Sequence, residues 1–361
     1  MLPTPALLVD RGVLLDNIAA MAARACTAHV ALRPHGKTHK SAEIAKLQVA
    51  HGAIGLAVAT LREAEYFAEH DVADLLITRQ IVGELGLQRL TRLAHQTQVT
   101  VAIDDVEVAQ AIDDAARRAR VDIGLLWELE CGARRSGTQP GMPSVEVLAS
   151  LVPSLRRASF EGLMTYGGHV YESANEAELE AAAEDEAAAV RETAQLLEDR
   201  GMPSRVLSIG TTPTACRITE RRGVTEIRPG GYVFNDATQL VMGLAAIENC
   251  ALVVLTTVVS RPTSNRIVLD AGAKALSTRQ LSRRVSGFGC LLDHPHLTIS
   301  RLSDEHGVVE SDSPISLRIG DRVKVIPNHA PSTVNQHCRM WVTDDGETLS
   351  GSFEIGARGW D

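Results

Sequence analysis

Short apolar runs alternate with segments of helical periodicity over the first two thirds of the chain. Apolar runs bounded by turn residues are typical of buried strands, and the segments between them are rich in helix formers. The predicted strands are residues 30–33, 55–59, 74–78, 99–103, 123–128, 159–164, 205–209 and 226–228. The predicted helices include one starting near residue 13 and residues 43–51, 61–70, 106–118 and 176–200.

Eight strands that alternate with helices favour an α/β fold, a (β/α)8 TIM-like barrel of parallel strands. We expect this barrel to occupy residues 10–245. Because all strands of such a barrel point the same way, their carboxyl ends form one mouth, where barrel enzymes place their chemistry.

After about residue 250 the pattern changes to β-branched runs separated by turn signals, which predicts a second, C-terminal domain of mainly antiparallel β structure. Its strands are expected at residues 252–259, 266–269, 297–299, 321–326 and 340–343. We place this domain at residues 246–361, and expect the strand at residues 6–9 to join it.

The composition narrows the class of protein. A length of 361 residues suits a large barrel with a smaller companion. No apolar run approaches the roughly 20 residues that span a membrane, and the first residues lack the pattern of a secretory signal, so we expect a cytoplasmic protein. A net charge of −9 with both signs interspersed argues against a nucleic-acid partner. The six dispersed cysteines form no C-x-x-C pair, which indicates neither disulfides nor a zinc ribbon.

The stretch Arg33-Pro34-His35-Gly36-Lys37-Thr38-His39-Lys40 follows the first barrel strand. A lysine at the carboxyl end of a barrel strand, partly desolvated and close to another cation, loses proton affinity and becomes a nucleophile near neutral pH. Such a lysine can form a Schiff base with an aldehyde. The alternative for a cluster of basic residues is a solvated loop.

This stretch, with the opening Thr4-Pro5-Ala6-Leu7-Leu8-Val9-Asp10, resembles the D-threonine aldolase and D-serine dehydratase family. These are pyridoxal 5'-phosphate enzymes of the alanine-racemase-like, fold-type III group. The resemblance implies that Lys37 carries the cofactor as a Schiff base. It also implies a homodimer with shared active sites and a small-molecule amino-acid substrate.

Two glycine-rich stretches follow the last two predicted barrel strands and resemble the phosphate-binding segments of the family. The first contains Gly210, Thr211 and Thr212, and the second contains Gly230, Gly231 and Tyr232. Loops in these positions are the usual phosphate site of barrel enzymes, because backbone N–H groups at a helix start can bind an anion. Each turn taken alone is also compatible with a structural role.

Further candidates follow the fifth and sixth barrel strands. In Glu128-Leu129-Glu130-Cys131-Gly132-Ala133-Arg134-Arg135, the resemblance places Arg135 near the phenolic oxygen of the cofactor, although a surface ion pair is the alternative. In Thr165-Tyr166-Gly167-Gly168-His169, it places Tyr166 and His169 beside the cofactor.

The second domain supplies His306 and His329 as acid/base candidates, by resemblance to family motifs. In the family, the histidine equivalent to His329 belongs to a His-x-Cys or His-x-Asp pair that binds a divalent metal (Mn, Mg or Zn). This chain reads His329-Ala330-Pro331, and proline has no donor atom for a metal. We predict that His337 and Cys338 lie adjacent on a strand, point to opposite faces and do not replace the missing ligand.

These features predict a lyase that acts on β-hydroxy-D-amino acids. Retro-aldol cleavage needs only a base at the β-hydroxyl, whereas expulsion of hydroxide benefits from a Lewis acid. We therefore favour a D-threonine aldolase-like reaction over D-serine dehydratase-like β-elimination. An amino-acid racemase, a transaldolase and a non-catalytic pyridoxal-phosphate carrier are the remaining alternatives.

Overall fold

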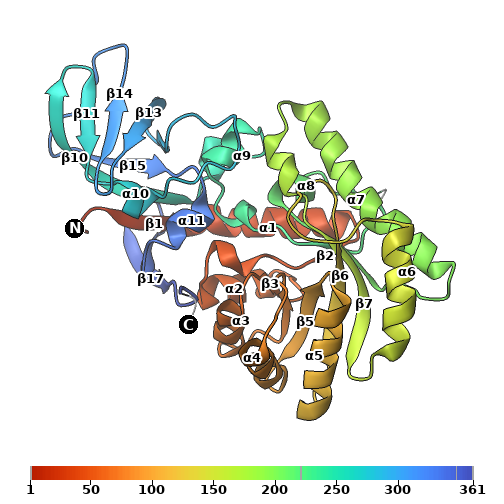
Figure 1. Ribbon diagram of the computed structural model, residues 1–361. Helices are drawn as coiled ribbons and strands as arrows, with labels where there is room; N and C mark the ends of the chain where they lie inside the picture. The colour runs from red at the N-terminus through yellow and green to blue at the C-terminus, as the bar shows by residue number, and fades with distance from the viewer. Residues whose placement is uncertain (1, 220–221, 347, 360–361) are drawn as a thin grey trace. The chain divides into compact units, whose positions relative to one another are not determined.

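The computed structural model describes residues 2–219, 222–346 and 348–359 (Figure 1). The chain forms two compact units. The barrel unit comprises Ala20–Lys37, Ile44–Gly230 and Ala357–Asp361, and the β unit comprises Met1–Ala19, Thr38–Glu43 and Gly231–Gly356. The expected domain boundary near residue 245 stays a prediction. Within the described residues, no helix is both long and apolar enough to cross a membrane.

Eight parallel strands form the sheet of the barrel unit, which confirms the predicted fold class. The strands are β2 (Ala31–Leu32), β3 (Leu56–Val58), β4 (Asp74–Ile77), β5 (Gln98–Ile103), β6 (Ile123–Leu129), β7 (Ala158–Thr165), β8 (Val206–Ile209) and β9 (Glu226–Ile227). Their order is β2-β9-β8-β7-β6-β5-β4-β3. The two outer strands meet because Ile54 N–H donates to Leu32 O and Ala57 N–H donates to Pro34 O, both at 2.9 Å.

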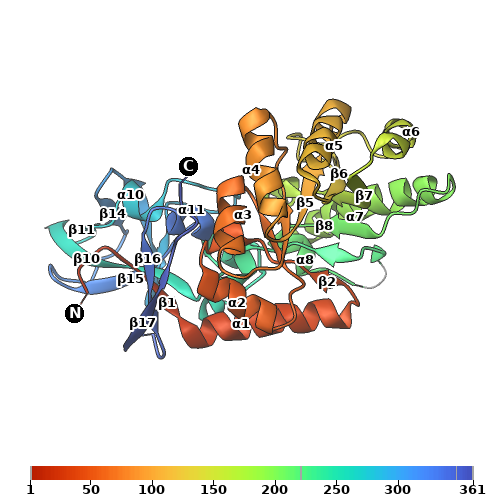
Figure 2. The same cartoon turned by 90° about the horizontal axis from the view of Figure 1, so that it is seen from below.

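Helices follow the strands and lie outside them, as Figure 2 shows for α4 and α5 beside β5 and β6. Side-chain caps fix their starts. Thr60 accepts the N–H of Glu63 before α3, and Asp105 accepts two N–H groups before α5. The helices from α1 to α8 are α1 (Arg11–Thr27), α2 (Ala42–Ala50), α3 (Leu61–Ala68), α4 (Glu84–Ala94), α5 (Val106–Ala119), α6 (Met142–Leu151), α7 (Glu176–Glu198) and α8 (Thr212–Ala215).

An apolar layer closes the middle of the barrel. It consists of Leu76, Ala102, Leu126 and Met164, each at most 2% exposed. These side chains come from four neighbouring strands, and their burial is the main reason for the apolar runs in the sequence. The layer separates the interior near the carboxyl ends of the strands from the interior near their amino ends.

The β unit contains a nine-stranded, mainly antiparallel sheet in the order β11-β14-β13-β12-β15-β10-β1-β16-β17. Its strands are β1 (Ala6–Asp10), β10 (Leu252–Thr263), β11 (Arg266–Leu269), β12 (Cys290–Leu291), β13 (His294–Leu302), β14 (Gly307–Glu310), β15 (Arg322–Ile326), β16 (Arg339–Thr343) and β17 (Leu349–Glu354). Its short helices are α9 (Ala237–Val241), α10 (Ala273–Leu276) and α11 (Ala330–Val334). Strand β1 lies between β10 and β16 and pairs with both.

Every strand and helix predicted by range is confirmed, with ends shifted by a few residues. Three strands of the β unit, β12, β14 and β17, were not predicted. Two of them are short, and β17 is exposed over most of its length, so neither length nor alternation marks them in the sequence.

Candidate active site

Lys37 lies in the 3-10 turn η1 (Gly36–Thr38), directly after the strand β2. A Cβ atom added at Gly36 would lie 2.7 Å from a ring carbon of Phe67, so only glycine lets the backbone pass this ring. Burial is the largest influence on the Lys37 ammonium and lowers its pKa to about 8, against an upward effect of Glu63 and with a further lowering by Arg135 and Arg228. The side chain remains partly accessible. A substantial fraction of this amine is therefore neutral and nucleophilic near physiological pH.

Lys37, Tyr166 and Arg135 come together inside the barrel unit from three different strand ends. The Lys37 Nζ atom lies 5.8 Å from the centre of the Tyr166 ring, and the guanidinium carbon of Arg135 lies 4.2 Å from the same centre. The ring thus has two cations close to it, an arrangement that aromatic faces favour. The three residues follow β2, β7 and β6 at the carboxyl ends of these strands.

Glu128, the penultimate residue of β6, holds Arg135 in this position. Its Oε1 atom lies 3.4 Å from Arg135 Nη2 and accepts a hydrogen bond from Ser136 Oγ at 3.0 Å. Gln80 Nε2 donates to the other oxygen at 3.1 Å. The carboxylate is nearly fully buried, so its charge is poorly screened. The sequence analysis gave neither Glu128 nor Gln80 a role. Glu128 opens the quoted motif but stands inside β6, and Gln80 follows β4 without a recognisable motif.

Arg228, which falls in the last predicted barrel strand and received no role in the sequence analysis, is a buried cation of the barrel unit. It donates through Nη1 to Ser208 Oγ and through Nη2 to the backbone oxygen of Thr165. Burial lowers its pKa, opposed by the nearby Glu226 carboxylate. Among the described residues, the buried Thr165 Oγ1 atom has no hydrogen-bond partner. In the sequence, the available sign of a role for Arg228 was its position at the end of a strand, immediately before Pro229.

The predicted phosphate segment at the end of β8 is a tight, internally bonded turn. Thr211 and Thr214 exchange backbone N–H to side-chain Oγ1 hydrogen bonds at 3.1 and 3.2 Å. The Gly210 N–H donates to Oε1 of Glu186, which also accepts the N–H of Gly167. Two of the N–H groups expected to face an anion are therefore already paired within the protein. The phosphate assignment stays a prediction.

Gly230, Gly231 and Tyr232 occupy the expected turn after β9. Gly230 ends the barrel unit, whereas Gly231 and Tyr232 begin the β unit in the 3-10 turn η5 (Gly231–Val233). The Tyr232 side chain is 4% exposed. Their role at a phosphate also stays a prediction.

His169 lies in η3 (Gly168–Glu172) and packs its ring against Gly132. A Cβ atom at Gly132 would lie 2.9 Å from the ring, and the backbone φ of +127° independently favours glycine there. Within the described chain, the buried Nδ1 atom of His169 has no hydrogen-bond partner. An unpaired buried nitrogen next to the Tyr166 segment is compatible with a polar group of a ligand.

The two histidines of the β unit have different surroundings. His329 ends the segment after β15 and precedes α11, and its Nδ1 atom lies 2.8 Å from Ser332 Oγ. His306 is exposed in the turn between β13 and β14, where its backbone oxygen accepts the N–H of Ser303 at 2.9 Å. Only His329 is therefore oriented by a side-chain contact that the structure specifies.

The donor set around His329 does not fit a divalent metal. Pro331 stands in the first turn of α11 and has no side-chain donor atom for a metal. No cluster of three or more His, Cys, Asp or Glu side chains suited to a metal occurs among the described residues. The predicted strand at His337 and Cys338 was wrong: both precede β16 in an irregular segment, and His337 Nε2 lies 2.9 Å from Ala275 O.

The barrel mouth, by contrast, fits pyridoxal phosphate. Lys37, Arg135 and Arg228 supply three positive groups for an anionic cofactor, next to the carboxylates of Glu63, Glu128 and Glu226. The orphaned Thr165 hydroxyl is a polar group that a ligand would satisfy. Lys37 has the lowered pKa that attack on an aldehyde requires.

A parallel barrel with a catalytic-type lysine after its first strand and an antiparallel β unit defines the alanine-racemase-like class of enzyme. Residues 9–238 match the family model for the alanine racemase N-terminal domain, and residues 251–343 match the model for the putative serine dehydratase domain. The chain belongs to the alanine-racemase-like family. Within that family it falls in the group of D-threonine aldolases and D-serine dehydratases, and it is a lyase of that group.

Known proteins match this chain over nearly its whole length, in sequence and in structure. The D-threo-3-hydroxyaspartate dehydratase of a Delftia species is 33% identical over 350 residues and covers 92% of each chain. The D-threonine aldolase of an Arthrobacter species is 32% identical, covering 99% of this chain and 93% of the relative. The crystal structure of D-threonine aldolase from Filomicrobium marinum matches with a TM-score of 0.91 at 30% identity, over 99% of this chain and 96% of that one. The alanine racemase of Clostridium difficile shares the fold, at 14% identity and a TM-score of 0.70.

Proposed function

We propose that this lyase cleaves β-hydroxy-D-amino acids by a retro-aldol reaction that needs no divalent metal. The observation that carries the proposal is the donor set at His329, where Pro331 removes the second protein ligand that the family motif would supply. Loss of hydroxide from the substrate benefits strongly from a Lewis acid, whereas carbon–carbon cleavage requires removal of a hydroxyl proton. Because one protein ligand for a metal is missing while His329 remains as a base, the site favours carbon–carbon cleavage over loss of hydroxide.

The barrel residues hold and orient the cofactor in this proposal. Pyridoxal phosphate, when bound, supplies the electron sink for a negative charge that develops at the substrate Cα atom. Lys37 would attach the cofactor through Nζ, and Arg135, which is paired with Glu128, would hold its phenolic oxygen. Tyr166 and His169 would help to hold the cofactor, and the turns at Gly210–Thr212 and Gly230–Tyr232 would bind its phosphate.

His329 acts as the base at the substrate β-hydroxyl, with His306 as the alternative. A neutral imidazole has one unprotonated ring nitrogen, which can accept this proton. The contact between His329 Nδ1 and Ser332 Oγ orients the ring. We also infer a homodimer with shared active sites, on the grounds of family membership. A cytoplasmic setting stays a prediction.

The test is an assay of the cofactor-loaded protein with D-threonine, D-serine, D-threo-3-hydroxyaspartate and D-alanine, each with EDTA or with added Mn²⁺ or Zn²⁺. We expect glycine and an aldehyde from D-threonine at a rate that EDTA does not change. The products are identified by mass. The variant Pro331→Cys, which recreates the His-x-Cys pair, should become sensitive to added metal, whereas Pro331→Ala should not.

Lys37→Ala should lose the activity and the cofactor absorbance above 400 nm, roughly where protein Schiff bases of this cofactor absorb. Lys46→Ala is the matched control, since Lys46 is an exposed lysine of α2. A keto acid that forms only with added metal would instead identify a dehydratase. Isomerised D-alanine would identify a racemase, and spectral changes without product would identify a carrier.

A further inference from the structure

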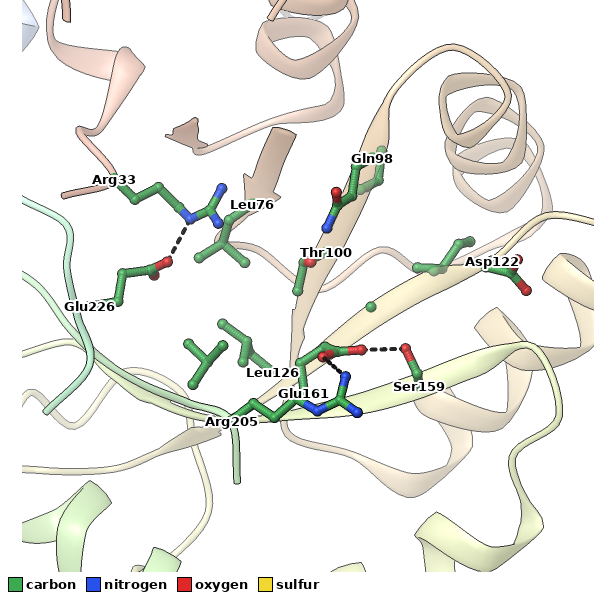
Figure 3. A pocket seen from close by; sticks show the side chains of 14 residues that line it. Arg33, Leu76, Gln98, Thr100, Asp122, Leu126, Ser159, Glu161, Arg205 and Glu226 are labelled. Atoms are coloured by element: carbon green, nitrogen blue, oxygen red, sulfur yellow. Dashed lines mark hydrogen bonds and ion pairs between the residues drawn. The ribbon is translucent and has the colours of Figure 1, made fainter. Parts of the chain in front are cut away.

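A cavity of about 380 Å³ opens at the amino-terminal end of the barrel, opposite the mouth that contains Lys37 (Figure 3). The first residues of β5, β6 and β7 surround it, among them Gln98, Ile123 and Ser159. Because the strands are parallel, these amino ends lie at the other end of the barrel from the candidate active site. The proposed lyase reaction makes no use of this cavity.

The cavity exists because small and polar residues occupy the bottom layer of the barrel. Barrel interiors are ordinarily filled by branched apolar side chains, but here Thr100 pairs in register with Gly124. A Cβ atom at Gly124 would lie 2.6 Å from Thr100 Oγ1 and 3.3 Å from Glu161 Cγ. The backbone of Gly124 lies outside the left-handed region, so chain geometry does not demand glycine there. Glycine at this position therefore lets the Thr100 hydroxyl and the Glu161 side chain approach the backbone of β6 closely.

The floor of the cavity is apolar. Leu76 and Leu126, from the buried layer across the middle of the barrel, line it together with Val206. A ligand that reaches the floor would gain from the removal of apolar surface from water, about 25 cal/mol per Å². The cavity therefore suits a molecule with a short apolar part.

The charged groups in the cavity wall differ in how well they are neutralised. Arg33 lies 2.7 Å from both Glu226 and Asp74, so its charge is fully compensated by two carboxylates. Glu161 accepts a hydrogen bond from Ser159 Oγ at 2.6 Å.

The only cation paired with Glu161 among the described residues is Arg205, at 3.8 Å. That arginine side chain is 84% exposed, so solvent screens most of its effect. Glu161 is 27% exposed and keeps lone pairs for another donor. The cavity thus presents an incompletely neutralised carboxylate above an apolar floor.

We propose that this cavity binds a small organic cation, a protonated amine with a short alkyl chain. The ammonium group would donate a hydrogen bond to the Glu161 carboxylate beside the Thr100 hydroxyl, and the alkyl chain would pack on Leu76, Leu126 and Val206. A charge-assisted hydrogen bond of this kind is among the stronger polar contacts in proteins. The Glu161 carboxylate would repel an anion, and a neutral molecule would lack the attraction between opposite charges.

Isothermal titration calorimetry of the cofactor-loaded full chain with N,N-dimethylbutylamine tests the proposal. This tertiary amine is charged at pH 7.5 and keeps one N–H donor, but it cannot form a Schiff base, so the cofactor does not contribute to the signal. Butan-1-ol and butyrate are neutral and anionic probes with the same chain length. We expect saturable binding of one equivalent of the amine, about tenfold or more tighter than either comparison probe.

The variant Glu161→Gln keeps the shape of the side chain and should weaken binding of the amine about tenfold or more. Glu198→Gln, on the exposed end of α7, is the matched control and should bind like the wild type. Gly124→Val should abolish binding by filling the cavity, and a melting curve shows whether this variant is folded. Equal affinities for the three probes, or an unchanged affinity in Glu161→Gln, would overturn the proposal.

Discussion

At the scale of single residues, Lys37 owes its chemical character to its surroundings. Removal of water from the ammonium lowers its pKa most, and the charges of Arg135 and Arg228 act in the same direction, while Glu63 opposes them. The result, a pKa of about 8, leaves the group mostly protonated at pH 7 but within reach of deprotonation. A lysine on an open surface would stay charged to about pH 10.

This environment predicts how fast the cofactor-free protein captures pyridoxal phosphate at different pH. Only the neutral amine attacks the aldehyde, so the rate should rise with pH and level off above about pH 8. Arg135→Gln removes a cation near Lys37 and should move the midpoint to higher pH. Stopped-flow absorbance measures the rate, with N-acetyl-lysine as the reference amine. A protein rate that rises in parallel with the reference up to pH 10 contradicts the expected lowering.

The same residue shows what a sequence can and cannot predict about a site. The position of Lys37 after a strand and its basic neighbours are visible in the sequence, as are Arg135 and Tyr166 after other strands. Glu128 is visible as part of the motif that contains Arg135, but its contact with Arg135 is not, and no motif marks Glu63. Glu63 acts on Lys37 from helix α3, and the contact between Glu128 and Arg135 depends on how the chain turns after β6, which no local pattern encodes.

At the scale of elements, the segment that contains His329 is held by helix α9. Ala237 N–H donates to Pro327 O at 3.0 Å, and Thr238 Oγ1 donates to Asn328 O at 2.6 Å. The Asp236 carboxylate accepts the N–H of Gln239 in α9 through Oδ1 and the N–H of Ala330 in α11 through Oδ2. One buried side chain therefore caps two helices, the second of which begins directly after His329.

Asp236→Asn should change both the stability and its pH dependence. Burial raises the pKa of Asp236 to about 7, so the folded protein holds this proton more tightly than the unfolded chain, where the pKa is about 3.9. The stability that Asp236 contributes through protonation is therefore fully present below about pH 4 and is lost as pH rises through about 7. The variant should lack this decline.

The variant should also lower the free energy of unfolding by about 1 kcal/mol at pH 7. The reason is that one amide oxygen replaces two carboxylate oxygens, so one of the two helix caps is lost. Urea unfolding between pH 5 and pH 8 measures both effects. Asp16→Asn, on the exposed face of α1, is the matched control. Parallel pH profiles for wild type and Asp236→Asn would contradict the assigned shift.

At the scale of the whole molecule, the first residues of the chain belong to the sheet formed by its last third. Strand β1 pairs with β10, with Leu8 opposite Val253, and with β16, with Leu8 opposite Trp341. The apolar run of β1 predicts a strand. Its place between β10 and β16 depends on pairing with segments far away in the sequence, which no local pattern shows. Leu7 and Val9 are at most 1% exposed, so β1 is part of the core of the β unit.

Deletion of residues 2–9 should therefore unfold the β unit rather than trim an end. Full burial of three large apolar side chains stabilises a protein by roughly 5 kcal/mol or more, which is comparable to the total stability of a typical domain. The deletion would also leave two strand edges, of β10 and β16, without hydrogen-bond partners. A synthetic peptide of residues 2–10 should restore the near-ultraviolet circular dichroism of Trp341, and a scrambled peptide should not. A deleted chain as resistant to urea as the full chain would show that β1 contributes little to the sheet.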